Sequence, residues 1–171
     1  MNEATSAAEG RGSRFGADAG ERISAGCYGA LVAASTLVGL TEASTGSLIL
    51  IVVLTNLIYF ATHVFAYTIG SPGEEGDEKA GWPTVRHHLA VSAPMVSVTF
   101  LPVALVVVLE LVGVDREPSV LAGVIVALAY LVVVATGGAF VRGLRPLTVV
   151  LVGVLTLVVS VALVAAKLSL H

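Results

Sequence analysis

Charged residues are scarce in this sequence. Asp, Glu, Lys and Arg make up 12% of its 171 residues, whereas a soluble domain averages about 25%. Hydrophobic residues reach 56%, and the mean hydropathy is +0.95. This composition excludes an ordinary soluble domain and predicts a membrane protein. The nine Lys and Arg residues are also too few for a nucleic-acid-binding surface.

Cysteines and catalytic motifs are also nearly absent. Cys27 is the only cysteine, so no disulfide can form within one chain. The sequence contains no Gly-rich phosphate loop, no CxxC motif and no HExxH motif. We therefore predict that the protein is not an enzyme and carries no cofactor and no protein-bound metal.

Long apolar runs are the dominant feature. Four of them are roughly 20 residues long, enough to cross the hydrocarbon core of a bilayer. These runs cover residues 47–69, 89–112, 119–140 and 147–168. A fifth run, 23–40, is shorter and richer in small residues, but carries no charge. A cleaved signal peptide is the alternative for this run, although the acidic residues before it make a poor basic leader. The sequence predicts an all-α polytopic membrane protein with five transmembrane helices.

The distribution of Lys and Arg predicts how these helices are threaded. With the N-terminus in the cytoplasm, seven of the nine basic residues lie on the cytoplasmic side, and only Arg116 and Lys167 lie outside. We expect a bacterial cytoplasmic membrane protein with its N-terminus inside and its C-terminus outside. Residues 1–21 are predicted to be a disordered cytoplasmic tail. Residues 22–171 form a single membrane domain, with an acidic cytoplasmic loop at 70–88.

A polar stripe in the second span is the main candidate site. Asn56, Tyr59, His63 and Tyr67 are spaced 3, 4 and 4 residues apart, which places them on one narrow face of a helix. An ionisable group at membrane depth suggests a functional site. One interpretation is a polar cavity in which His63 carries protons or binds a cation. The other is hydrogen bonding between helices without any chemistry. Heme or metal ligation is a further alternative.

The two ends of the third predicted span carry further candidate residues. His87 and His88 begin the third span, so a site built from His63, Tyr67 and one of these histidines is geometrically possible. Glu110 lies at the far end of that span, where we expect a carboxylate that pairs with Arg116 or with the single lysine of the last span.

Proline and small residues predict helix geometry and contacts. Pro94 and Pro102 should each kink the third span. Small residues that let helices approach closely follow two faces of the first span and recur in the last two. They are Ala25, Gly29 and Ala33, then Gly26, Ala30 and Ala34, and finally Gly137, Gly138 and Gly153.

The segments ERISAGCYGALVA, ATHVFAY and AAKLSLH resemble a group of small actinobacterial integral membrane proteins of unknown function. RISAGCYGALVAASTLVG and GGAFVRGLRPL are similar to the first span and to the link after the fourth span of the vacuolar iron transporter family. That resemblance implies five spans, an internal N-terminus, a cytoplasmic loop after the second span and a dimer. The acidic residue of that family's first span is replaced here by Cys27-Tyr28-Gly29, so no metal ligands are carried over.

Two functions fit these observations. The first is a small cation- or proton-linked transporter or channel, with the polar stripe lining its cavity. The second is a non-catalytic membrane subunit or scaffold, in which the stripe holds helices together and the acidic loop binds a partner protein. Small-residue faces also fit a homo-oligomer or a membrane partner.

Overall fold

The chain folds into six helices within the part that the structure describes. The computed structural model describes residues 2–70, 82–141 and 143–169. The helices are α1 (Asn2–Val38), α2 (Thr45–Gly70), α3 (Trp82–Ser92), α4 (Pro94–Leu111), α5 (Arg116–Val141) and α6 (Pro146–Ser169). No strand occurs in these ranges, which confirms the all-α class. The three segments long and apolar enough to cross a membrane are Thr45–Ile69, Trp82–Leu111 and Arg116–Val141.

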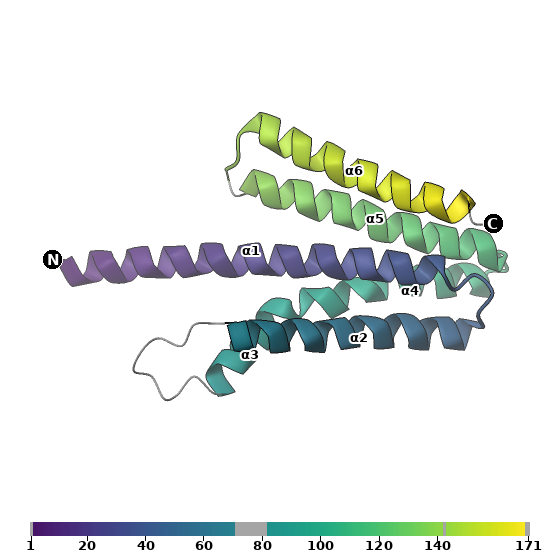
Figure 1. Cartoon of the computed structure of the whole chain (residues 1–171), viewed down its shortest axis with the longest axis horizontal. Coiled ribbons are helices and arrows are strands. Elements are labelled where there is room, and N and C mark those ends of the chain that lie inside the picture. The colour runs from purple at the N-terminus through teal and green to yellow at the C-terminus, as the bar shows by residue number, and fades with distance from the viewer. Residues whose placement is uncertain (1, 71–81, 142, 170–171) are drawn as a thin grey trace.

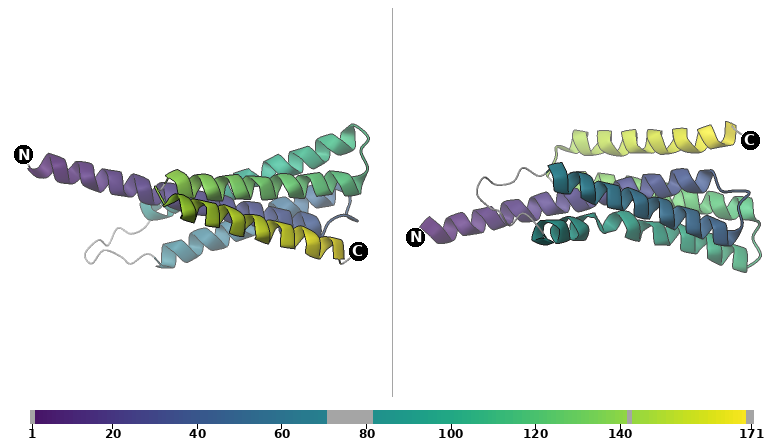
Figure 2. Two further views of the ribbon diagram at one scale, coloured as in Figure 1. Left: turned by 90° about the horizontal axis from the view of Figure 1, so that it is seen from above. Right: turned by 60° about the horizontal axis from the view of Figure 1, so that its bottom comes forward.

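The helices run along one long axis, with the two ends of the chain at opposite ends of the bundle (Figure 1). Helix α1 lies in the centre and contacts α2, α3, α4 and α5, whereas α6 packs mainly on α5. The N-terminal part of α1 extends beyond the other helices (Figure 2). The least apolar of the predicted spans is therefore the one that other helices surround.

Small side chains explain the central position of α1. Ala25, Ala30, Ala33 and Ala34 are each at most 1% exposed, which confirms that both predicted faces are contact faces. At Gly29 the backbones of α1 and α4 nearly touch. A Cβ atom there would overlap the carbonyl oxygen of Met95 and lie 2.8 Å from its Cα. A helix with such faces gains stability from close backbone packing more than from its own hydrophobicity.

The glycines of α5 and α6 behave differently from one another. A Cβ at Gly138 would lie 2.7 Å from the Ile23 side chain, and one at Gly153 would lie 3.1 Å from Thr136 Oγ1. Gly137 has no atom within 4 Å of its Cβ position. The prediction of helix contacts is thus confirmed within the chain for Gly138 and Gly153, whereas Gly137 lies on the open side of α5.

The N-terminal segment differs from its prediction. Residues 2–21 continue α1 as one helix instead of forming a disordered tail. Alanine, the residue with the best helix propensity, recurs through this segment. Once the packed part of α1 has formed, each added residue contributes one more hydrogen bond, without the cost of nucleation.

The predicted third span is divided at Ala93, immediately before Pro94, into the helices α3 and α4. Pro94 has no N–H to donate to the carbonyl of Ala90, so α3 ends at Ser92 and α4 begins at Pro94. Pro102 lies inside α4 without ending it. Residues 82–88, predicted as part of the loop, already belong to α3, because proline at position 83 suits the first turn of a helix. The acidic run at 74–78 lies outside the described residues.

Candidate functional site

The polar stripe of α2 separates into an inward and a lateral part. Asn56 is fully buried, and its side-chain N–H donates to the carbonyl of Val52 at 3.1 Å. Tyr59 is 43% exposed and meets Tyr28 of α1 edge to face, with ring centroids 5.8 Å apart. His63 is half-buried. The stripe therefore combines interhelical packing with side chains at the helix surface.

His63 and Tyr67 join the two histidines of α3 in one cluster. The ring centroids of His63 and Tyr67 are 4.6 Å apart, and those of Tyr67 and His88 are 5.8 Å apart. The ring centroids of His87 and His88 are 5.7 Å apart. The site that the sequence made geometrically possible is thus assembled in the structure, from α2 and α3 together.

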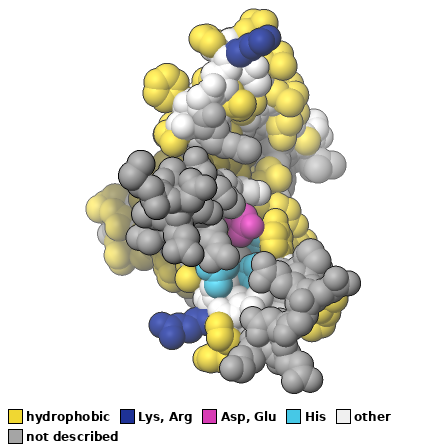
Figure 3. Space-filling model, turned by 90° about the vertical axis from the view of Figure 1, so that its left-hand side faces the viewer, with side chains coloured by type: hydrophobic (Ala, Val, Ile, Leu, Met, Phe, Trp, Pro, Cys, Tyr) yellow, Lys and Arg dark blue, Asp and Glu magenta, His cyan; other side chains and the backbone are white. Residues whose placement is uncertain are grey.

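Helix α1 adds an acidic residue to this cluster. His87 Nε2 lies 3.3 Å from Asp18 Oδ1, and the two side chains are 49% and 40% exposed. We call His63, Tyr67, His87, His88 and Asp18 the histidine cluster. Figure 3 shows histidine side chains beside an acidic one at this end of the bundle. The cluster extends from His63, seven residues before the end of α2, to the partly exposed carboxylate of Asp18.

Sequence reasoning missed Asp18, because it was assigned to a disordered tail. A signal was present. Asp18 lies seven residues before Ala25 and eleven before Gly29, so it shares their side of the helix when the helix continues. Gly29 contacts α4, and Asp18 accordingly lies against α3, which precedes α4.

A second polar cluster lies at the opposite end of α2 and α4. Arg116 Nη1 donates to Glu110 Oε1 at 2.7 Å, and Thr45 Oγ1 donates to Glu110 Oε2 at 2.6 Å. Arg116 Nη1 also lies 3.1 Å from Thr45 Oγ1. We call these three residues the Glu110 cluster. It confirms the predicted Glu110–Arg116 pair and ties together the starts of α2 and α5 and the end of α4.

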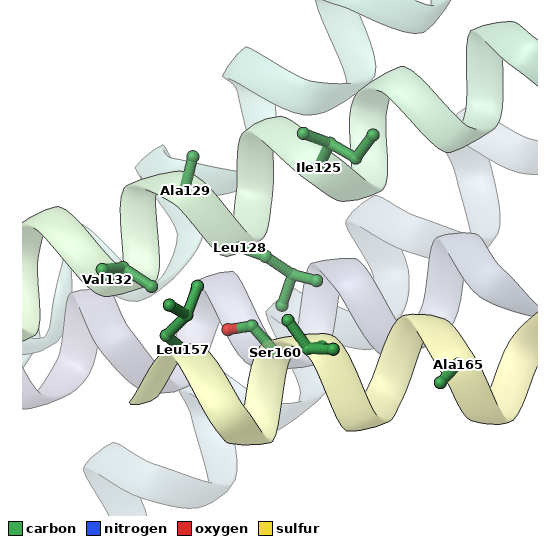
Figure 4. Close-up of a pocket in the computed structure, with 8 residues that line it drawn as sticks. Ile125, Leu128, Ala129, Val132, Leu157, Ser160 and Ala165 are labelled. Carbon is green, nitrogen blue, oxygen red and sulfur yellow. The ribbon is translucent and has the colours of Figure 1, made fainter. Parts of the chain in front are cut away.

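Two hollows lie away from the polar stripe. One, of about 500 Å³, is lined by Thr41, Glu42, Arg116 and Glu117 beside the Glu110 cluster. The other, of about 390 Å³, lies between α5 and α6 and is apolar (Figure 4). Its one polar lining residue, Ser160, donates its hydroxyl to the carbonyl of Thr156 at 2.8 Å. Neither hollow involves the histidine cluster.

Metal ligation has no assembled donor set in the described ranges. There, no three His, Cys, Asp or Glu side chains lie close enough together to hold one ion. In the histidine cluster, the rings contact one another in series rather than converging on a point.

Comparison with known proteins gives no relative. No protein-family model, no curated protein and no solved structure matches the chain. The resemblances to the actinobacterial group and to the vacuolar iron transporter family therefore stay predictions.

Proposed function

We propose that this chain is a five-span protein of the bacterial cytoplasmic membrane, with its N-terminus inside and its C-terminus outside. Three apolar helices, the opposite placement of the two chain ends and the seven-to-two bias of basic residues support this threading. Helices α1 and α6 complete the five spans. Helix α1 needs less hydrophobicity than a lipid-facing span, because its neighbours cover much of its apolar segment.

Within this membrane domain, we infer a small proton-linked transporter or channel. The observation that carries this inference is the continuous series of contacts from His63 through Tyr67, His88 and His87 to Asp18. His63 lies seven residues before the end of α2, about 10 Å into the helix. Histidine is the side chain best suited to gain and lose protons near neutral pH. The cluster thus connects a proton acceptor inside the membrane to the cytoplasmic surface.

Proton flux into liposomes tests this function. The purified protein is reconstituted with a pH-sensitive dye inside, and a potassium gradient with valinomycin drives proton movement. We expect a flux above that of empty liposomes, and at least a tenfold loss in His63→Gln, because glutamine keeps a polar side chain but does not carry protons in this way. Thermal unfolding of the variant in detergent should match that of the native protein.

A lipid-facing substitution on the same helix serves as the matched control. Phe65 is 67% exposed, so Phe65→Leu should leave both flux and stability unchanged. Native flux equal to that of empty liposomes would refute the proposed function. So would a His63→Gln variant that retains full flux.

A membrane subunit or scaffold is the second candidate. Full burial of Asn56 and the contact between Tyr28 and Tyr59 favour it, since both are interhelical packing. In a scaffold, the acidic segment 71–81 would bind a partner protein, and His63→Phe would lower stability or assembly with no flux to lose. Sedimentation of the native protein in detergent would show whether the chain also associates with itself.

A further inference from the structure

Four side chains in the described part of the chain have a buried polar atom without a hydrogen-bond partner: Asn56, Thr99, Arg116 and Thr136. Of these, Asn56 and Thr99 are the two most deeply buried. Asn56 of α2 is 0% exposed and Thr99 of α4 is 1% exposed. Asn56 Nδ2 is satisfied by Val52, but neither Asn56 Oδ1 nor Thr99 Oγ1 has a hydrogen-bond partner. A polar atom inside an apolar bundle is costly unless it is hydrogen-bonded. We therefore expect each of these atoms to have a hydrogen-bond partner.

Helix geometry predicts that these two residues of α2 and α4 lie at the same level. Thr45 Oγ1 donates to Glu110 Oε2, which fixes one pair of neighbouring positions on the two antiparallel helices. Asn56 lies eleven residues after Thr45, and Thr99 lies eleven residues before Glu110. Eleven residues are about three full turns and about 16 Å of helix. We therefore infer that each residue lies on the same side of its helix as the Thr45–Glu110 contact, at matching depth.

The backbone of α4 contributes a further acceptor at this level. Pro102 lies inside α4 and has no N–H to donate to the carbonyl of Val98, its usual helical acceptor. Val98 precedes Thr99 directly. Three polar groups are thus expected at the same depth in the bundle: the Thr99 hydroxyl, the Asn56 amide oxygen and the Val98 carbonyl, which lacks its helical donor.

We propose that Asn56 and Thr99 form an internal water site between α2 and α4. The water accepts a hydrogen bond from the Thr99 hydroxyl and donates to Asn56 Oδ1 and to the Val98 carbonyl. Three partners are typical of a buried water. A cation is disfavoured because these oxygens are neutral and Glu110 lies about 16 Å away along the helix. This inference does not depend on proton transport by the histidine cluster.

The composition of the chain permits a direct test. Asn2 and Asn56 are the only asparagines, and the sequence has no glutamine. Selective ¹⁵N-asparagine labelling of the full chain in nanodiscs therefore gives two pairs of side-chain amide signals, which Asn56→Ser assigns. We expect a nuclear Overhauser cross peak between a long-lived water and the Asn56 amide protons, and its loss in Thr99→Val. Absence of the peak in the native protein, or its persistence in Thr99→Val, would overturn the proposal.

Replacing choline chloride by sodium chloride in the same sample distinguishes water from a cation. Unchanged Asn56 signals support water. A sodium-dependent shift of those signals would overturn water as the occupant and assign the site to a cation.

A double-mutant cycle tests the link between the two residues. Asn56→Leu and Thr99→Val should each lower Tm by about 3 °C or more, because each removes one of the three hydrogen-bond partners of the buried water. The double variant should lose clearly less than the sum of the two shifts. Thr62→Val is the control, since the Thr62 hydroxyl donates only within its own helix and is exposed. Additive shifts would overturn the shared site.

Discussion

Gly29→Ala is expected to destabilise the protein by about 3 kcal/mol, at the upper end of the usual cost of overpacking. The added methyl group would overlap the backbone of Met95 rather than a flexible side chain. To remove this overlap, α1 and α4 must move apart. Such a movement disturbs other contacts as well, because α1 also packs against α2, α3 and α5. Thermal or denaturant unfolding in detergent measures the loss, and size-exclusion chromatography shows whether the variant still assembles.

A glycine on the same helix provides the matched control. Gly20 has no atom within 4 Å of its Cβ position, so Gly20→Ala should be neutral or raise stability by about 0.4–1 kcal/mol. If Gly29→Ala were as stable as Gly20→Ala, the close approach of α1 to α4 would be contradicted.

Arg116→Leu is expected to cost about 3 kcal/mol, because it leaves the Glu110 carboxylate paired only with Thr45. Both side chains of the ion pair are less than one-third exposed, at 26% for Arg116 and 15% for Glu110, so solvent screens the pair only partly. Glu110→Leu should cost a similar amount, since it leaves the guanidinium without its carboxylate. Unfolding of both variants at fixed pH and ionic strength gives the two values.

The double variant measures how strongly Glu110 and Arg116 interact with each other. Glu110→Leu combined with Arg116→Leu removes both charges, so its loss should be smaller than that of either single variant. Glu117→Gln, an exposed neighbour at the start of α5, should change stability by less than about 0.5 kcal/mol. A double variant whose loss equals the sum of the two single losses would show that the charges do not act as a pair.

The candidate residues were only partly predictable from sequence. Spacing along α2 showed that His63 and Tyr67 share a face, since helical periodicity is local. Which ring of α3 meets Tyr67 depends on how two helices pack across the link between them. Asp18 was missed because a segment rich in small and charged residues is typical of a tail, and only attachment to a packed helix extends α1 through it.

The glycine contacts were likewise only partly predictable from the sequence. The pair Gly137-Gly138 predicts a contact, but the two positions point about 100° apart on the helix, so one meets Ile23 while the other is open. The pairing of Glu110 with Arg116 was predictable, because six residues and a short link separate them. Its third member, Thr45, comes from another helix and required the fold.

The sequence alone determined that the chain is helical, that it has long apolar segments and that proline perturbs the third predicted span. These properties follow from composition, length and backbone chemistry, which act over a few neighbouring residues. Only the tertiary structure decided that α1 is central, that Asp18 reaches His87, and that Asn56 and Thr99 are buried. Each of these depends on the register between helices, which is set by close packing of residues far apart in the chain.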